Sequence, residues 1–256
     1  MPAHIIASPT VTWSGSPIAL MSFDQVTLNQ TSGAAQYVTQ ANVNKALADL
    51  RSWSGTISGQ LATPVTGQGL GVTYSTGYAS HVESLSVTVN AAVEQFYTSS
   101  SSSRWMEALP STLSWSGSYV ALVDDDDPII AVGADATPAA MTFTISSSNT
   151  LAGSVVSTSI VSDIPVGRLH RVTVQVQGDG TLTAAGTGNI FAAGAIAPMA
   201  AATLTIKAHE VGTTDVQYSG SAFWNQLTVN AATAGLIKSS IGFQGSGALT
   251  IADAAV

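Results

Sequence analysis

The chain has no cysteine and few charged residues, and both shortages narrow what it can be. Without thiols it has neither disulfides nor thiolate metal sites, so packing, backbone ladders or assembly must supply its stability. Charged residues make up 9% of the 256 residues, and the seven Lys and Arg are scattered while fifteen carboxylates bring the net charge to −8. A protein that neutralises phosphates needs a basic stripe. We therefore expect no specific binding of DNA.

Long apolar runs are also missing. No uninterrupted run reaches the roughly 18 apolar residues that a membrane span requires. The first six residues, Met1 to Ile6, place no basic region ahead of a sustained apolar stretch, which is the pattern of a signal peptide. We therefore expect a protein that is made in a cytoplasm and has no membrane partner.

The residues that dominate instead are Thr, Ser, Ala, Gly and Val, a bias that favours closely packed strands over surface helices. Trp53 to Thr63 alternates apolar and polar residues, and Leu113 to Val123 does the same. This alternation predicts two half-buried strands in a mainly β fold. Trp53 and Trp115 are then expected to be structural core anchors, although exposed tryptophans on a sheet would stack on sugars.

Short phrases recur along the chain. Ser-Trp-Ser-Gly begins at Ser52 and again at Ser114, and upstream of each lies a similar strand, Val26-Thr27-Leu28-Asn29 and Val87-Thr88-Val89-Asn90. Further on, Thr142 to Ile145 resembles Thr203 to Ile206, and each is followed by a strand that ends in a Gln-Gly-x-Gly-x-Leu-Thr phrase. We call the two Trp-containing segments front halves and the two segments that end in the Gly-rich phrase back halves. Both front halves precede both back halves along the chain, which indicates an internal repeat.

The simplest arrangement that gives this order is a nested one, in which one complete unit is inserted into a loop of the other. Such an insertion is tolerated at a surface loop when the inserted unit has neighbouring termini. It predicts an N-terminal arm (1–16), an outer unit (17–78 plus 200–251), an inserted unit (80–184) and a linker rich in Gly and Ala (185–199). The rival order pairs each front half with the back half nearest in sequence after a strand exchange.

Two short helical segments are also predicted. Val43, Ala46, Leu47 and Leu50 fall at i, i+3, i+4 and i+7, which places them on one face of a helix between Thr39 and Ser52. Arg104 to Leu109 is expected to make a brief helical turn that stops at Pro110.

The densest charge is Asp124-Asp125-Asp126-Asp127-Pro128. A calcium loop of the EF-hand type would need a central Gly and a terminal Glu, and neither follows. A solvated turn is the plainer interpretation, and an acidic patch at the lumen or rim of an assembly is the alternative. The four histidines, His4, His81, His170 and His209, form no metal-binding spacing, and no Gly-x-Ser-x-Gly elbow is present. No catalytic, metal or cofactor site is therefore predicted.

Several phrases together resemble one known family. Val87-Thr88-Val89-Asn90, Trp105-Met106-Glu107-Ala108-Leu109-Pro110, Leu113-Ser114-Trp115-Ser116-Gly117 and Gln177-Gly178-Asp179-Gly180-Thr181-Leu182-Thr183 resemble, in this order, the major tail tube protein of long-tailed, siphovirus-like bacteriophages. The match is best over residues 82–183, and the outer unit lacks the Trp-x-Glu-x-Leu-Pro turn. The resemblance implies a duplicated β-sandwich or barrel fold with a short flanking α-helix in each unit.

The resemblance also implies an assembly. Known rings of the family contain six such units, so three chains with two units each would close a pseudo-hexameric ring, and six chains are the alternative. Stacked rings would form the hollow tail tube of the virion. Its partners would be further copies of the chain, the tape-measure protein, and the tail terminator and tip proteins, while DNA would pass through without specific binding.

The function expected from the sequence is that of a virion structural protein without enzymatic activity. One alternative is a bacterial surface or adhesive β protein that binds glycans, and such a protein would require a secretion signal. A second alternative is a hydrolase on a β scaffold, which would require catalytic side chains that converge on one site. The third is a phage head decoration or head-to-tail completion protein, which assembly into tubes would distinguish from a tail protein.

Overall fold

A computed structural model describes most of the chain. The described residues are 9–18, 20–38, 44–61, 70–74, 77–79, 81–96, 105–123, 137–146, 149–186, 200–208, 215–233 and 235–254. They form fourteen strands in one hydrogen-bonded sheet and no helix. All the named strands pair antiparallel, as in β1 with β12 and β7 with β8. The prediction of a mainly β fold is confirmed.

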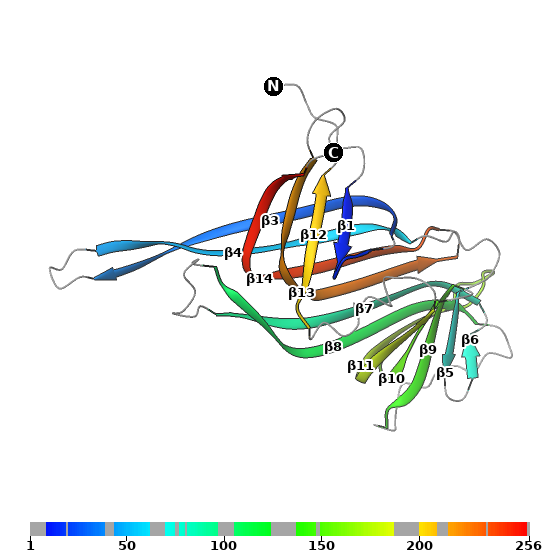
Figure 1. The fold of residues 1–256 in the computed structure, drawn as a ribbon. Helices are drawn as coiled ribbons and strands as arrows, with labels where there is room; N and C mark the ends of the chain where they lie inside the picture. The colour runs from blue at the N-terminus through cyan, green and yellow to red at the C-terminus, as the bar shows by residue number, and fades with distance from the viewer. Residues whose placement is uncertain are drawn as a thin grey trace.

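The strands differ widely in length, and the long ones curve through the molecule (Figure 1). In chain order they are β1 (Thr10–Trp13), β2 (Ser16–Pro17), β3 (Leu20–Val38), β4 (Asn44–Leu61), β5 (Gly71–Tyr74), β6 (Gly77–Ala79), β7 (His81–Phe96), β8 (Glu107–Leu122), β9 (Ala139–Ser146), β10 (Asn149–Asp163), β11 (Arg171–Gly186), β12 (Ala202–Ala208), β13 (Asp215–Ala232) and β14 (Lys238–Ala254).

Strand pairing runs along two paths with the same order. The first path is β2-β1-β12-β13-β14-β4-β3, and the second is β6-β5-β9-β10-β11-β8-β7. Each strand of the first path thus has a counterpart in the second, for example β13 with β10 and β3 with β7. The paths are joined where β13 pairs with β7 from Gln226–Asn90 to Ala232–Ser84.

Register shifts recur at matching places in the two paths. The shift between Trp224 and Gln226 in β13 has its counterpart between Ser157 and Ser159 in β10. The shift between Gly33 and Ala34 in β3 matches that between Ala92 and Val93 in β7. Because a bulge inserts one residue and redirects the strand, matching bulges give the two paths the same bends. Residue-by-residue counterparts can therefore be assigned.

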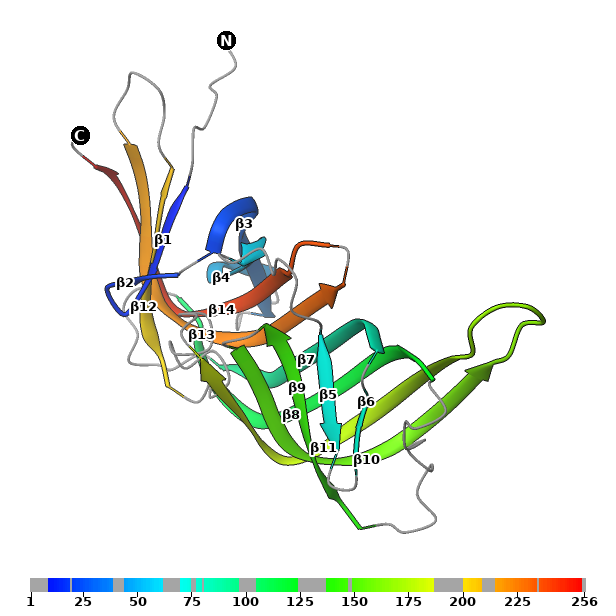
Figure 2. The ribbon, with the colours of Figure 1, turned by 90° about the vertical axis from the view of Figure 1, so that its right-hand side faces the viewer.

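Each path folds over itself into two layers, because its long central hairpin contributes to both (Figure 2). In the second path, residues 157–163 of β10 lie beside the part of β11 that pairs with β8, whereas residues 149–155 pair with β9. The β13–β14 hairpin of the first path is divided in the same way between β12 and β4. Apolar side chains fill the space between the layers.

A buried tryptophan marks the equivalent point of each core. Trp53 and Trp115 are each 1% exposed. The Trp53 indole N–H donates to the Gly247 carbonyl at 3.0 Å, and the Trp115 indole N–H donates to the Gly180 carbonyl at 3.1 Å. Both acceptors are glycines with φ near +75°, a backbone region that favours glycine. The repeated Gly-x-Gly phrase therefore forms the wall of each tryptophan pocket.

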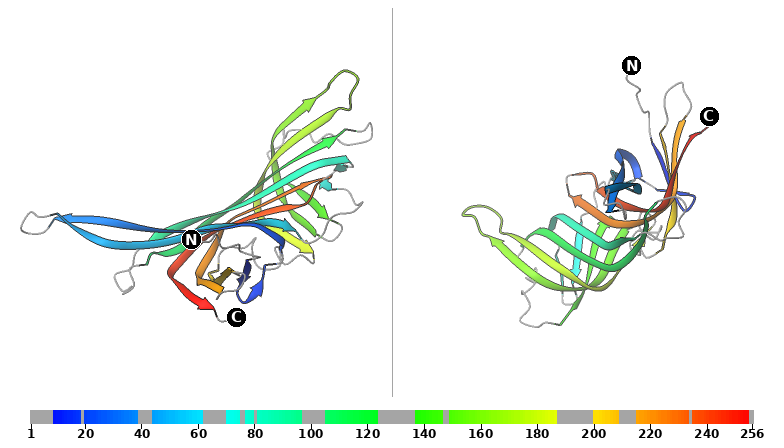
Figure 3. Two further views of the ribbon diagram at one scale, coloured as in Figure 1. Left: turned by 90° about the horizontal axis from the view of Figure 1, so that it is seen from above. Right: turned by 90° about the vertical axis from the view of Figure 1, so that its left-hand side faces the viewer.

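The helix predicted between Thr39 and Ser52 is wrong wherever the structure describes it. Residues 44–61 form β4, which pairs with β3 from Val38–Asn44 through Gly33–Leu50 to Leu20–Leu61. A helix of two turns is marginal by itself, whereas a long hairpin satisfies the backbone of both strands. The ladder therefore overrides the helical spacing. Figures 1 and 3 show this hairpin reaching beyond the rest of the sheet.

The helical turn predicted for 104–109 is also wrong in its described part. Trp105 forms a bridge with Arg51, and β8 begins at Glu107 and runs through Pro110. A proline lacks the N–H for a ladder bond and is tolerated in a strand at a bulge. Pro110 lies at such a place, because the register shifts between Ala92 and Val93 opposite it.

The predicted unit boundaries remain a prediction, but two strands bear on where they would fall. β1 belongs to the segment predicted as an arm, and it pairs with β12. Its counterpart β5 falls within residues 17–78, which are predicted to belong to the outer unit, and it pairs with β9. The Trp53 strand pairs with β14 and the Trp115 strand pairs with β11, and the nested arrangement stays a prediction.

Candidate functional site

The most extensive surface feature is one face of the continuous ladder β3-β4-β14-β13-β7-β8-β11-β10. Its inner face carries buried residues such as Val87, Val229 and Ile241, each at most 1% exposed. Because side chains alternate along a strand, the residues between them point to the other side. That outer side carries mainly hydroxyl and amide groups, with the apolar Val120 and Val161 among them. The polar residues are Thr27, Asn29, Ser54, Thr56, Ser58, Ser86, Thr88, Asn90, Ser116, Ser118, Thr173, Gln175, Gln226, Thr228 and Ser240.

Hydrogen bonds between side chains connect neighbouring strands across this polar face. The Thr88 and Thr228 hydroxyls lie 3.4 Å apart, and Gln226 Nε2 donates to Asn90 Oδ1 at 3.3 Å. Both contacts cross the β13–β7 junction between the two paths. The polar face therefore continues from one path to the other without a break.

Charged residues stand at one end of this face. Arg171 and Glu83 form a two-point ion pair, with Nε–Oε2 at 2.9 Å and Nη2–Oε1 at 3.0 Å. The hydrogen bond and the charge of Glu83 raise the pKa of Arg171 above its usual range. Asp163 pairs with Arg171 across β10 and β11, and Lys238 occupies the position in β14 that Arg171 has in β11. In the part of the chain that the structure describes, the middle of the face carries no charge.

The ladder ends in two edges. Among the described residues, β3 pairs only with β4, and residues 157–163 of β10 pair only with β11. Unpaired strand edges present N–H and C=O groups that template further pairing. The turn beyond the β10 edge carries exposed apolar residues: Ile164 is 73% exposed, Val166 is fully exposed and Leu169 is 68% exposed. Such a cluster is typical of an interaction surface.

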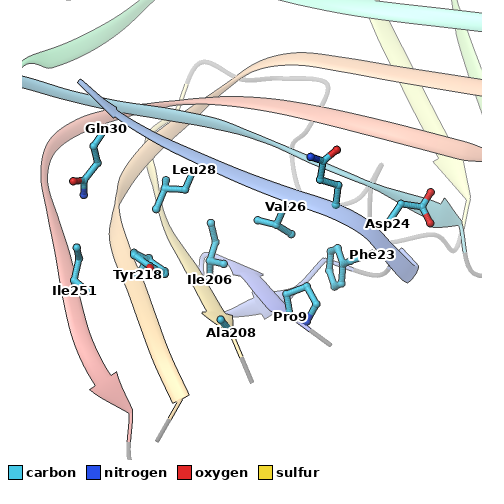
Figure 4. A pocket seen from close by; sticks show the side chains of 11 residues that line it. Pro9, Phe23, Asp24, Val26, Leu28, Gln30, Ile206, Ala208, Tyr218 and Ile251 are labelled. Atoms are coloured by element: carbon cyan, nitrogen blue, oxygen red, sulfur yellow. The ribbon is translucent and has the colours of Figure 1, made fainter. Parts of the chain in front are cut away.

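A pocket of about 710 Å³ opens beside the β3 edge (Figure 4). Phe23, Val26 and Leu28 of β3 line one side, and Ile206 of β12 and Tyr218 of β13 line the other. The pocket lies between the two layers of the first path. The corresponding residues of β7, such as Leu85 and Val87, are buried at 3% and 1% exposure.

The residues singled out in the sequence are dispersed. Asp124, Asp125, Asp126 and Asp127 lie outside the described residues, so their role as a lumen or rim patch stays a prediction, and His4 and His209 also lie outside. Trp53 and Trp115 are in the core, so their rings do not face solvent as a sugar-stacking site requires. His170 has a buried Nε2 without a hydrogen-bond partner among the described residues.

The described residues contain no group of three or more His, Asp or Glu side chains placed to hold a metal ion. They also include no helix that is long and apolar enough to cross a membrane. The features that the sequence analysis missed are the polar face and the two edges. The alternating Ser and Thr residues of the strands are a sequence signal for the polar face. The edges have no such signal, because they depend on which strands pair with each other.

Comparison with protein-family models and with curated proteins finds no match to this chain.

Proposed function

We propose that the chain is a virion structural protein, the major tail tube subunit of a long-tailed bacteriophage. In this proposal its ladder curves around a lumen, and rings of the protein stack into the hollow tube through which DNA leaves the virion. The observation that carries it is the polar face, uncharged along its described middle, which continues across both strand paths. The resemblance of the Trp and Gly phrases to the tail tube family supports the same function.

The polar face has the chemistry that a conduit for DNA needs. Cations along a wall would bind phosphates and slow the passage of the polymer, because each neutralised phosphate adds affinity through counterion release. Hydroxyl and amide groups keep the wall hydrated without that attraction. The net charge of −8 adds a general repulsion of DNA.

The paired organisation of the chain supports a closed ring of three copies. Two strand paths of the same order, joined edge to edge, make each chain a double unit. A sheet that closes on itself removes the edges that invite uncontrolled pairing. In this proposal the units run from β1 to β4 plus β12 to β14, and from β5 to β11, with the described β1 and β5 in equivalent places.

Negative-stain electron microscopy of the purified protein tests this function. We expect hollow tubes, or rings that stack into tubes as the concentration rises. Isolated particles of constant size at high concentration, which bind glycans on an array, would contradict it and favour a surface adhesin. Caps or clusters that bind only to heads would favour a head decoration protein.

A further inference from the structure

We propose that the β10 edge of one copy pairs antiparallel with the β3 edge of the next copy, with Ser162 opposite Leu28. This inference rests on the proposed function, since it names the contact by which the ring would close. It makes the contact between chains a repetition of the β13–β7 contact within each chain. The occupant of the β3 edge and its pocket is therefore a second copy of this chain.

The internal junction supplies the template. β13 pairs with β7 with Leu227 opposite Val89, Val229 opposite Val87 and Ala231 opposite Leu85. All six side chains are buried, at 4% exposure or less. Beyond the ladder, the Thr233 N–H donates to the Glu83 carbonyl at 2.9 Å, and its hydroxyl donates to the Val82 carbonyl at 2.7 Å.

Counterparts in the second path follow from the shared registers. In the first path Gly55 lies between Leu28 and Phe243, and in the second path Gly117 lies between Val87 and Val176. Leu28 is therefore the counterpart of Val87. In the same way the shared bulges make Ser162 the counterpart of Val229, because each lies four residues beyond its bulge residue, Thr158 or Asn225.

Transferring the template then fixes the register of the contact between copies. On the core face it places Ile160 opposite Gln30, Ser162 opposite Leu28 and Ile164 opposite Val26. Val166 takes the place of Thr233, so its backbone N–H would donate to the Asp24 carbonyl of the next copy. The apolar end of the β10–β11 hairpin would thus cover the open side of the pocket beside β3 (Figure 4).

Residues at the proposed contact are more exposed than their counterparts at the internal junction, as expected if a second copy covers them. Ala231 is 4% exposed at the internal junction, whereas its counterpart Ile164 is 73% exposed. Leu85 is 3% exposed, whereas its counterpart Val26 is only partly buried. Burial of apolar surface favours association, so the larger side chain at position 164 strengthens the contact.

A second contact within the chain, between β14 and the start of β8, also has a counterpart between copies. The Gly247 N–H of β14 donates to the Met106 carbonyl at 2.9 Å, and the Ala108 N–H donates to Ser246 Oγ at 3.1 Å. The counterpart of Ser246 is Asp179 in β11, which is exposed. Ala46 in β4 is the counterpart of Ala108 in β8, since each lies nine residues before its matching glycine, Gly55 or Gly117. The Asp179 carboxylate would therefore accept from the backbone N–H of Ala46 in the next copy. Both neighbouring strands, β3 and β4, therefore contact the same partner.

Disulfide cross-linking tests the register directly, because the chain has no cysteine of its own. Ser162→Cys protein is mixed with Leu28→Cys protein and oxidised, and Val161→Cys is mixed with Asn29→Cys. We expect both mixtures to give covalent dimers, since paired residues in adjacent strands lie within disulfide reach. Mixing Ser162→Cys with Asn29→Cys is the matched control, in which the side chains point to opposite faces and the cross-link should be lost.

Thr88→Cys with Thr228→Cys in one chain is the positive control, because these hydroxyls already lie 3.4 Å apart. Tubes that form while neither mixture cross-links would overturn the register and leave the tail tube function standing. Cross-linked rings that never stack would support the register and count against the tube. A protein that stays monomeric at high concentration and does not cross-link would overturn both.

Discussion

At the scale of single residues, the two tryptophan pockets depend on glycine. A Cβ added to Gly245 would overlap the Trp53 ring, and one added to Gly178 would overlap the Trp115 ring. We expect Gly245→Ala and Gly178→Ala each to lower the free energy of unfolding by about 1–3 kcal/mol or more, the usual cost of overpacking a core. Chemical denaturation measures this. Gly33→Ala is the control, because its Cβ would meet only the Leu50 carbonyl at 3.8 Å.

If the two substitutions lower the free energy of unfolding by equal amounts, the two tryptophan pockets are equivalent. If Gly178→Ala were neutral while Gly245→Ala unfolded the chain, the two pockets would not be equivalent. The Gln244 and Gln177 side chains extend the comparison, since they donate to the Trp53 and Trp115 carbonyls respectively, each at 2.8 Å.

A second residue-scale prediction concerns alkaline pH. Burial raises the pKa of the Tyr119 hydroxyl above its ordinary value of 10.0, and the neighbouring Tyr74 adds to the rise. The folded state therefore holds this proton more tightly than the unfolded state. Its contribution to stability is complete below pH 10 and is lost as the pH rises further.

Tyr119→Phe removes that proton and should flatten this part of the pH dependence. Free energies of unfolding between about pH 9 and pH 11 measure the effect. We expect the parent to lose stability relative to Tyr119→Phe as the pH rises. Parallel curves for the two proteins would show that Tyr119 does not titrate differently in the folded state.

At the scale of strands, Val87 and Leu28 occupy the same position in β7 and β3. Among the described residues, β7 pairs with β8 and also with β13, whereas β3 pairs with β4 alone. We expect Val87→Lys to unfold the monomer, because a charge would be buried without a partner. Leu28→Lys should leave the monomer folded and prevent its association, since an inward-pointing charge on an edge blocks pairing. Circular dichroism and light scattering distinguish the two effects.

Thr73→Lys is the control for added charge, because Thr73 is exposed on a strand that is paired on both sides. It should change neither folding nor association. Rings formed as well by Leu28→Lys as by the parent would remove β3 from the contact.

The strands also show how far the sequence could predict the fold. Alternation around Trp53 and Trp115 predicted both strands, because a half-buried strand has a period of two. The spacing of Ala46, Leu47 and Leu50 predicted a helix where β4 lies, since local spacing carries no information on the long partner β3. Repeated phrases located the counterparts only to within two residues: Leu28, not Val26, matches Val87.

Candidate sites were harder to predict than strands. The polar face was present in the alternating Ser and Thr, but a single strand does not reveal that eight strands place such residues on one surface. The free edges depend on which segments pair across the chain, such as β13 with β7, whose paired residues are more than 100 positions apart. Composition did indicate a protein without a basic stripe for phosphates, because its cations are few and scattered.

At the scale of the whole molecule, the described residues form two curved strand paths joined edge to edge, and within this part of the chain the edge at either end has no partner strand. The two edges differ in sequence, so a contact between them is head to tail. Head-to-tail contacts generate a ring if the rotation closes and a filament if it does not. We propose that the ring closes after three chains, because the resemblance assigns six units to a ring.

The mass and symmetry of the assembled particle test that claim most directly. Native mass spectrometry of a single ring, with class averages of the same sample by electron microscopy, would count the chains and the lobes. We predict three chains and six lobes in a closed ring. Six chains in each ring would contradict the pseudo-hexamer while leaving the tube, and an open helical filament or a two-fold dimer would contradict the head-to-tail ring itself.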